Sequence, residues 1–244
     1  MKPLYYTLVI LLSLSWQPLA AQTSHDQAEA RAIYQQANAA SNSVALRTGL
    51  KKQATSFLGD GSFQPGALRT FDGRYRPVPG LRFHAGLHMV EVQDSMELDS
   101  THLWPIGSLR GFDIGEVETG AGAAALRRFR PRLVKEGNAG ARREFVEVLT
   151  TVDAGPLLLG WLYSSGTDAT VGRISLAPLL LVGPGNSITE PLRPAELNQS
   201  AVLRLFGGRS DEVRSFANGQ HLQFDNPTDV ARIIDYYNRV ALVK

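Results

Sequence analysis

The chain has 244 residues, of which 43% are hydrophobic and 20% charged, and its formal net charge is +2. These values are typical of a folded globular protein, so the composition excludes a disordered chain and predicts one domain of ordinary size. The small net charge gives no reason to expect nucleic-acid binding. The absence of cysteine excludes disulfides, thiolate zinc sites and a cysteine nucleophile.

The first 21 residues have the pattern of a secretory signal peptide. Met1 and Lys2 precede an apolar run from Leu4 to Trp16, and small residues close the segment at Ala21. The apolar run is shorter than the roughly 20 residues that a membrane span needs, and no later segment resembles one. We therefore expect a periplasmic or secreted protein with cleavage after Ala21 and no transmembrane segment afterwards.

Residues 22–56 are expected to be helical or irregular. The stretch from Ser24 to about Ala40 is rich in Ala and Gln, with Ser24 as a candidate cap, which predicts a short helix. Its apolar stripe is weak, so this helix is expected to dock loosely.

Residues 57–192 have the sequence pattern of an antiparallel β domain. Short β-branched and aromatic runs alternate with Gly and Pro, and tight turns are expected at Asp72-Gly73, Asp153-Ala154-Gly155 and Gly183 to Asn186. No long helix separates the runs, so a meander that forms a sandwich or a partly open barrel is expected. The predicted strands are Ala67–Phe71, Tyr75–Val78, Gly80–His84, Leu87–Gln93, Gly107–Ile114, Leu126–Val134, Arg143–Val152, Leu157–Ser164, Ile174–Val182 and Ser187–Leu192.

Two histidines, His84 and His88, stand four residues apart, the spacing of metal ligands on one helix face. A helix here would carry Gly86 in its middle and Pro79 just before its start. A hairpin that turns at Ala85-Gly86 explains the neighbouring residues better, and it places the two side chains apart. We therefore predict ordinary turn-flanking histidines, and His84 and His88 remain only weak candidates for metal ligands.

The charges are strongly segregated along the middle of the chain. Acidic residues dominate from Glu91 to Glu118, and basic residues dominate from Arg127 to Arg143. Arg128, Arg130 and Arg132 alternate with apolar residues, as on a strand with one solvent-exposed face. We favour pairing of these opposite charges between neighbouring strands. The alternative is that Arg128, Arg130 and Arg132 bind an anionic envelope polymer or a lipid headgroup.

Signatures of catalysis or of a cofactor are weak. Residues 120–125 match the dinucleotide-binding pattern G-x-G-x-x-A, but they lack the preceding buried strand and the βαβ context, so a loop is expected. The acidic stretch DSMELDS lacks the central glycine of a calcium loop. No nucleophile elbow, P-loop or H-E-x-x-H motif is present. We therefore expect no cofactor and assign no catalytic residue.

Residues 193–244 are predicted to form a cap of three short helices. Pro194 suits the first turn of one helix, Ser210 is expected to cap a second, and Asn226-Pro227 opens a third. In the third, apolar residues recur at helical spacing from Val230 to Val240, so one face is expected to be buried on the sheet. The alternative is a helix that is exposed for a partner.

The order of these segments resembles an uncharacterised group of exported proteins of Bacteroidota. The shared features are two hairpins, a strand that ends in Phe and a terminal helix with a YYN motif. The matching residues are Gly73, Tyr75, Val78 and Leu81-Arg82-Phe83, then Phe112, then Phe145, Val148-Leu149 and Leu157-Leu158-Leu159, and finally Ile233 to Asn238. The resemblance implies an exported, β-rich protein and brings no catalytic residue with it.

From these observations we expect a non-enzymatic envelope protein that acts as a binding or structural module. Its partner would be an envelope protein, a glycan or a lipid, bound on a sheet face or at the arginine-rich edge. Two alternatives are a periplasmic lipid carrier, which would have an open apolar concave face, and an envelope hydrolase with a site assembled from distant residues.

Overall fold

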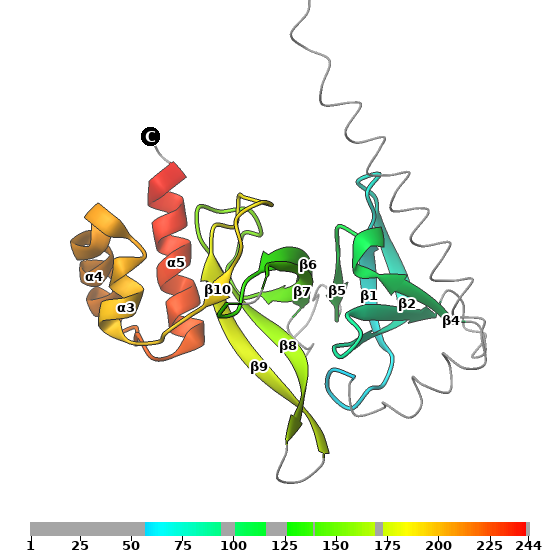
Figure 1. Cartoon of the computed structure of the whole chain (residues 1–244). Coiled ribbons are helices and arrows are strands. Elements are labelled where there is room, and N and C mark those ends of the chain that lie inside the picture. The colour runs from blue at the N-terminus through cyan, green and yellow to red at the C-terminus, as the bar shows by residue number, and fades with distance from the viewer. Residues whose placement is uncertain (1–56, 94–100, 116–125, 139, 169–172, 243–244) are drawn as a thin grey trace, which may run out of the picture.

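The protein is mainly β, with one antiparallel sheet followed by helices (Figure 1). The structure, a computed structural model, describes residues 57–93, 101–115, 126–138, 140–168 and 173–242, with backbone alone between 164 and 177. The predicted signal peptide, the helix from Ser24 and the 120–125 loop lie outside the described residues. None of the described helices has the length and apolar content to span a membrane.

The ten strands form a single open sheet in the order β10-β9-β8-β7-β6-β5-β1-β2-β3-β4. Two meanders therefore meet where β1 pairs with β5, and every strand pair is antiparallel. This confirms the predicted antiparallel sheet. The strands are β1 (Gln64–Arg69), β2 (Tyr75–His84), β3 (Met89–Gln93), β4 (Thr101–Pro105), β5 (Gly111–Ile114), β6 (Arg127–Val134), β7 (Arg142–Val148), β8 (Leu158–Asp168), β9 (Arg173–Gly183) and β10 (Arg193–Pro194).

Several strand boundaries differ from those expected. The two strands predicted on either side of Pro79 are one strand, β2, and β4 was not predicted at all. The segment Ser187–Leu192 is not a strand, because only Leu192 forms a bridge, to Val134 of β6. A 3-10 helix, η2 (Ile106–Ser108), precedes β5. Pro79 does not break β2 because it lies at the register shift opposite Gln64 and Gly66, where it has no pairing partner in the neighbouring strand.

The sheet curls strongly around an aromatic core. Phe83 of β2 and Phe145 of β7 stand four strands apart in the sheet, a separation of about 19 Å if the sheet were flat. Their rings nevertheless lie 5.9 Å apart, with Phe112 and Phe129 stacked between them at 4.6 Å. All four side chains are buried. The sheet must therefore bend so that its inner face wraps around these phenylalanines.

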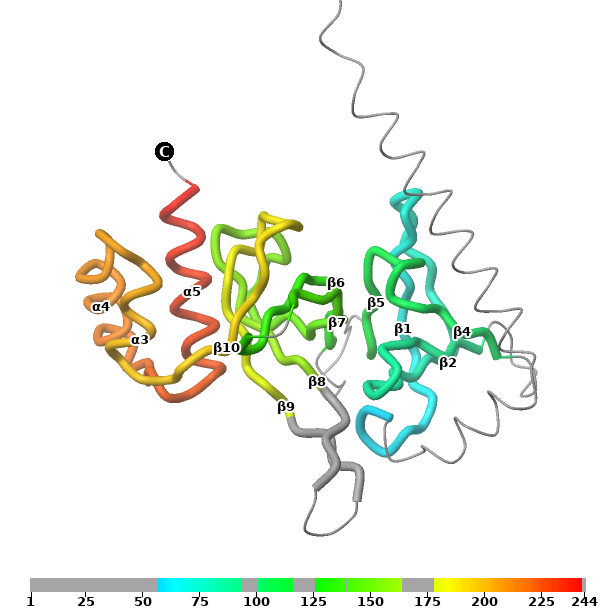
Figure 2. Tube along the Cα trace, viewed as in Figure 1, coloured from blue at the N-terminus to red at the C-terminus, as the bar shows by residue number. Residues whose placement is uncertain are grey.

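Three described helices cover the other end of the sheet, as predicted, but two of the expected start signals were wrong. The helices are α3 (Gln199–Arg204), α4 (Ser210–Gly219) and α5 (Pro227–Leu242), with a 3-10 turn, η3 (Gly207–Arg209), between the first two. Pro194 lies in β10, and the first helix begins at Gln199 because Asn198 caps it through Ala201 N; Ser210 is the first residue of the second helix and does not cap it. Figure 1 shows α5 between the sheet and the other two helices, and Figure 2 follows the chain from β1 at one end to the helices at the opposite end.

Helix α5 uses its apolar stripe to join the helices to the sheet. Val230, Ile233 and Ile234 are buried in one cluster with Leu159 of β8 and Leu180 of β9. The stripe repeats every three or four residues, so it forms one continuous face of the helix. The predicted packing of the third helix on the sheet is thus confirmed.

Candidate functional site

The arginine cluster, which we define as Arg128, Arg130 and Arg132, lies on one face of β6. The strand register places Arg128 opposite Asp113 of β5 and Arg130 opposite Val146 of β7. The loop between β7 and β8, residues 149–157, folds back over this face and supplies most of the contacts of the cluster.

Two aspartates bind the arginine cluster from opposite sides. Arg130 Nε donates to Asp153 Oδ2 at 2.5 Å, and its Nη1 donates to Asp113 Oδ1 at 2.6 Å. Arg128 Nη1 donates to Asp153 Oδ1 at 2.8 Å, and Arg132 Nη2 donates to the carbonyl of the same aspartate. Arg69 of β1 also lies 3.3 Å from Asp113. The arginines therefore pair both with a neighbouring strand, through Asp113, and with the loop, through Asp153.

The burial of this network makes its pairing important for stability. The side chain of Arg130 is 4% exposed and that of Asp113 1%. A buried ion pair adds little net stability, but removing one partner leaves an uncompensated buried charge, at a cost of about 3–5 kcal/mol. Binding of an external anion by the arginine cluster remains a prediction, and the described partners of Arg128 and Arg130 are all internal.

Helix α5 holds the loop that covers the arginines. Asp235 accepts hydrogen bonds from the backbone nitrogen of Thr151 at 2.8 Å and from its hydroxyl at 2.6 Å. Asn238, which is 1% exposed, accepts from Leu157 N at 2.9 Å and donates to Leu157 O at 2.8 Å. A methyl group at Gly155 would come within 2.6 Å of the Asn238 amide, so the close approach requires glycine.

The terminal DYYN motif therefore has a structural explanation. Its first and last residues, Asp235 and Asn238, face the loop, whereas Tyr236 stacks on Phe216 of α4 and Tyr237 packs against Phe206. Residues three apart share a face of an α-helix, so the two polar side chains point to the sheet together. The motif thus connects α5 to the loop between β7 and β8, to α4 and to Phe206 in the turn after α3.

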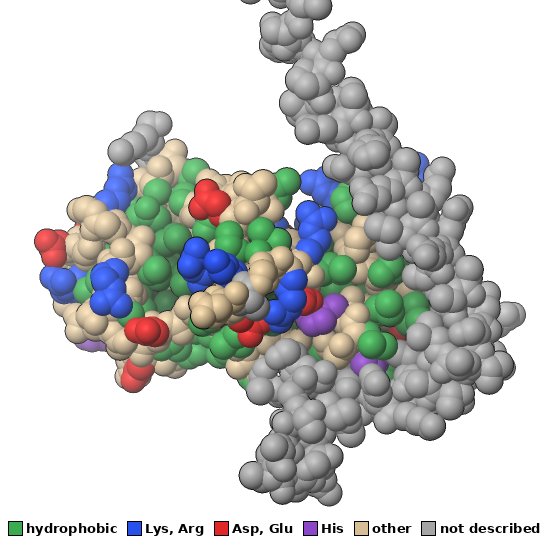
Figure 3. All heavy atoms as spheres, viewed as in Figure 1, with side chains coloured by type: hydrophobic (Ala, Val, Ile, Leu, Met, Phe, Trp, Pro, Cys, Tyr) green, Lys and Arg blue, Asp and Glu red, His purple; other side chains and the backbone are tan. Residues whose placement is uncertain are grey.

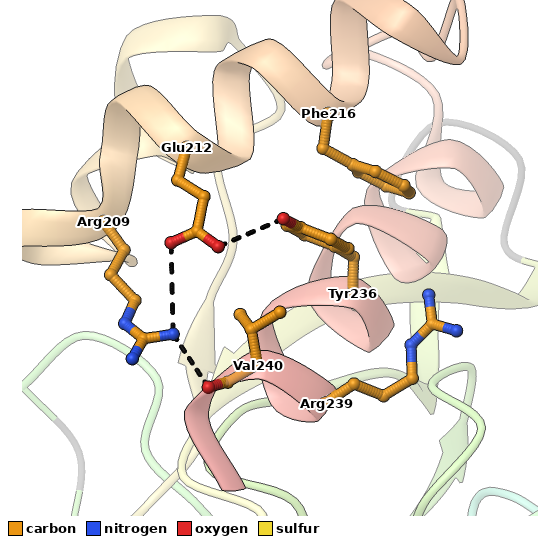
Figure 4. Close-up of a pocket in the computed structure, with 6 residues that line it drawn as sticks. All are labelled: Arg209, Glu212, Phe216, Tyr236, Arg239 and Val240. Atoms are coloured by element: carbon orange, nitrogen blue, oxygen red, sulfur yellow. Dashed lines mark hydrogen bonds and ion pairs between the residues drawn. The ribbon is translucent and has the colours of Figure 1, made fainter. Parts of the chain in front are cut away.

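A hollow lies on the helical cap, between α4 and α5 (Figure 4). Its volume is about 760 Å³, and we call it the α4–α5 hollow. It is lined by Arg209, Glu212 and Phe216 from the α4 side and by Tyr236, Arg239 and Val240 from α5. The rings of Phe216 and Tyr236 are parallel and stacked with centroids 3.9 Å apart, which gives the hollow a flat aromatic wall.

The polar groups of the hollow are partly fixed and partly free. Arg209 Nη1 donates to the carbonyl of Val240 at 2.8 Å and lies 4.0 Å from Glu212. Tyr236 donates its hydroxyl to Glu212 at 3.1 Å; burial and then this hydrogen bond raise the pKa of Tyr236, so it is neutral at pH 7. Arg239 is exposed and forms no ion pair with any residue that the structure describes.

A third polar group lies on the inner face of the sheet. Arg127 binds Glu147 through two hydrogen bonds, of 2.7 and 2.8 Å, and Tyr163 donates to the same carboxylate at 2.6 Å. Burial and then the hydrogen bond to Glu147 raise the pKa of Tyr163 far above its ordinary value. All three side chains are engaged with one another, so they form a closed polar unit next to the phenylalanine core.

The two histidines occupy a hairpin, as the sequence predicts, although the turn is longer than two residues. His84 ends β2 opposite Met89, and His88 lies in the turn with a positive φ of 48°. His84 is fully buried against Phe57, and burial lowers its pKa. His88 Nδ1 lies 2.7 Å from Glu144 of β7. In the described part of the chain, no three His, Asp or Glu side chains gather closely enough to hold a metal ion.

Basic and acidic side chains are interspersed with hydrophobic ones over the face in Figure 3. In the comparisons with known proteins, no family model, no curated protein and no solved structure matches the chain. The fold and the polar groups described above are therefore the basis for assigning a function.

Sequence reasoning missed the α4–α5 hollow. The sequence places Tyr236 and Arg239 on one side of a predicted helix, because they are three residues apart. Arg209 and Glu212 are likewise three residues apart, and Phe216 follows Glu212 by four. These patterns indicate two faces that carry aromatic and basic residues. That the two faces meet depends on the packing of α4 on α5, which the local pattern does not specify.

Proposed function

We propose that the protein is an exported, non-enzymatic binding module of the cell envelope that holds an anionic group in the α4–α5 hollow. The ligand would be an acidic envelope polymer or an anionic lipid headgroup. The proposal rests chiefly on one observation, the exposed and unpaired Arg239 beside a stacked aromatic wall. The signal-peptide pattern of residues 1–21 and the motifs shared with exported proteins of Bacteroidota support the compartment.

The chemistry of the hollow suits an anion attached to a larger, partly apolar group. Arg239 offers a guanidinium that forms no ion pair with a described residue, while the charge of Arg209 is offset by Glu212 of the same lining, which leaves one excess positive charge at the hollow. Guanidinium groups bind carboxylates and phosphates through paired hydrogen bonds. The flat surface of Phe216 and Tyr236 would contact the apolar part of the same ligand.

The two alternative functions find less support in the described residues. A lipid carrier needs an open apolar concave face, whereas the inner face of the curved sheet is filled by Phe83, Phe112, Phe129 and Phe145. We infer that the curved part is a partly open barrel with a solid core. A hydrolase that works through a pair of carboxylates needs them free, and the buried ones at Asp113 and Glu147 are held by arginines.

The test is a charge reversal on α5 with a matched control on the same helix. Arg239→Glu removes the free guanidinium of the hollow, and Arg232→Glu changes the net charge equally at an exposed site outside it. Each variant and the wild type would be titrated with polygalacturonate and with phosphatidylglycerol vesicles, and with dextran and phosphatidylcholine vesicles as neutral counterparts.

We expect the wild type to prefer one anionic probe over its neutral counterpart. Arg239→Glu should weaken that binding by about tenfold or more, which is the loss of one charge-assisted contact. Arg232→Glu should weaken it less than about threefold. Equal losses in the two variants would show that only net charge matters, and no preference for either anionic probe would refute the proposed function.

A further inference from the structure

Two buried donors of the arginine cluster lack a partner among the described residues. They are Nη2 of Arg130 and Nε of Arg132. The other guanidinium nitrogens of these two side chains all donate to carboxylate or carbonyl oxygens. A buried N–H without an acceptor destabilises the folded protein, and the penalty is larger for a charged group. Such donors indicate a bound group that supplies the missing acceptors.

The charge of the network points in the same direction. Within the described part of the chain, Arg69, Arg128 and Arg130 form ion pairs with two carboxylates, Asp113 and Asp153, and Arg132 bonds to the Asp153 carbonyl. Four positive charges and two negative ones leave an excess of two positive charges. Burial lowers the pKa of Arg132, while the charge of Asp153 opposes this shift and the charge of Arg130 adds to it.

Part of the network is open to solvent. Arg130 and Arg132 are two residues apart on one face of β6, and both donate to Asp153, so the two guanidinium groups converge on the same residue. The side chains of Arg128 and Asp153 are 21% and 24% exposed, which leaves the network in contact with solvent at the loop. A ligand that satisfies the unpaired donors and the excess charge needs several acceptor oxygens and two negative charges.

We propose that the arginine cluster holds a small inorganic dianion, sulfate or phosphate, against Arg130 Nη2 and Arg132 Nε. This site is separate from the α4–α5 hollow and does not depend on the proposed function. The ion would neutralise the excess charge and join β6 to the loop that α5 holds. The anion predicted for Arg128, Arg130 and Arg132 is then an internal structural ion of tetrahedral shape, not a polymer.

The first experiment measures thermal unfolding of the mature protein against sodium sulfate at constant ionic strength, balanced with sodium chloride. General salting-out by sulfate rises without saturation, so a saturable shift in the melting temperature identifies a site. Arg132→Gln removes one unpaired donor, while Arg193→Gln on β10 is the control of equal charge change. Arg239→Gln reports separately on the hollow. A selenate soak of wild-type crystals, read by anomalous scattering, locates the ion directly.

We expect saturable stabilisation of the wild type and an apparent dissociation constant for sulfate that is about tenfold to a hundredfold higher in Arg132→Gln. Arg193→Gln should bind sulfate as the wild type does, with the selenate peak beside Arg130. A non-saturable response, equal losses in Arg132→Gln and Arg193→Gln, or a selenate peak only at the hollow would overturn the inference. Loss in Arg239→Gln alone would support the hollow and refute this site.

Discussion

Asn238 should be among the most sensitive polar positions for stability, because it satisfies both backbone groups of Leu157 at once. Replacing it with Ala removes an acceptor 2.9 Å from Leu157 N and a donor 2.8 Å from Leu157 O. Each lost hydrogen bond leaves a part-buried backbone group without a partner, which costs about 1–2 kcal/mol of stability. The free energy of unfolding should therefore fall by about 2–4 kcal/mol. For a chain of this size, that lowers the melting temperature by roughly 5–15 °C.

The assay is urea unfolding of the mature protein, followed by fluorescence, with hydrogen exchange of backbone amides alongside. Asn218→Ala is the matched control, because Asn218 is exposed near the end of α4. Asn238→Ala should also speed exchange in the loop of residues 149–157, whereas amides of α4 should be unaffected. If both variants lose less than about 0.5 kcal/mol, the two hydrogen bonds do not hold the loop and the reasoning about α5 is refuted.

Further predictions concern the core, the buried histidine and the arginine network. Phe83→Ala should lower the free energy of unfolding by about 3–5 kcal/mol in urea titrations, whereas Ile188→Ala, at an exposed site, should change it by less than about 0.5. Burial lowers the pKa of His84 in the folded state below its ordinary value of 6.5, so the unfolded chain takes up this proton first and stability is lost as the pH falls below 6.5. His84→Gln should make that loss smaller between pH 7 and about 5, and an unchanged pH profile would contradict it. Asp153→Asn should destabilise the protein by about 2–4 kcal/mol, because it leaves two arginines of the cluster without their shared carboxylate, while the exposed Asp225→Asn should have little effect.

Local signals in the sequence were sufficient for the last helix and for the end of α4, whereas Pro194 does not start the first helix and Ser210 does not cap the second. Asn226-Pro227 and Gly219 mark the start of α5 and the end of α4, because proline suits a first helical turn and glycine a last one. The apolar repeat in α5 then fixed which face is buried. Each of these features depends on neighbours within a few residues, so the sequence pattern could predict them.

Long-range pairing explains what the sequence did not predict. The turn at Asp153-Ala154-Gly155 was expected, yet its place over the arginine cluster depends on Asp235 and Asn238, about 80 residues later in the chain. The pairing of β1 with β5 likewise joins segments separated by the whole β2–β4 meander. Strand β4 was missed because its short run carries a terminal proline and follows an acidic stretch.

The proposed function requires that the α4–α5 hollow binds an anion. Mapping the residues that a bound ligand contacts is the most direct test of this binding. Backbone amide resonances of the labelled mature protein would be recorded during titration, in turn, with a galacturonic-acid oligomer and with phosphatidylglycerol nanodiscs. We predict that one of the two probes shifts resonances mainly in residues 209–216 and 236–240. Shifts confined to the sheet, or none with either probe, would contradict binding of an anion at the hollow.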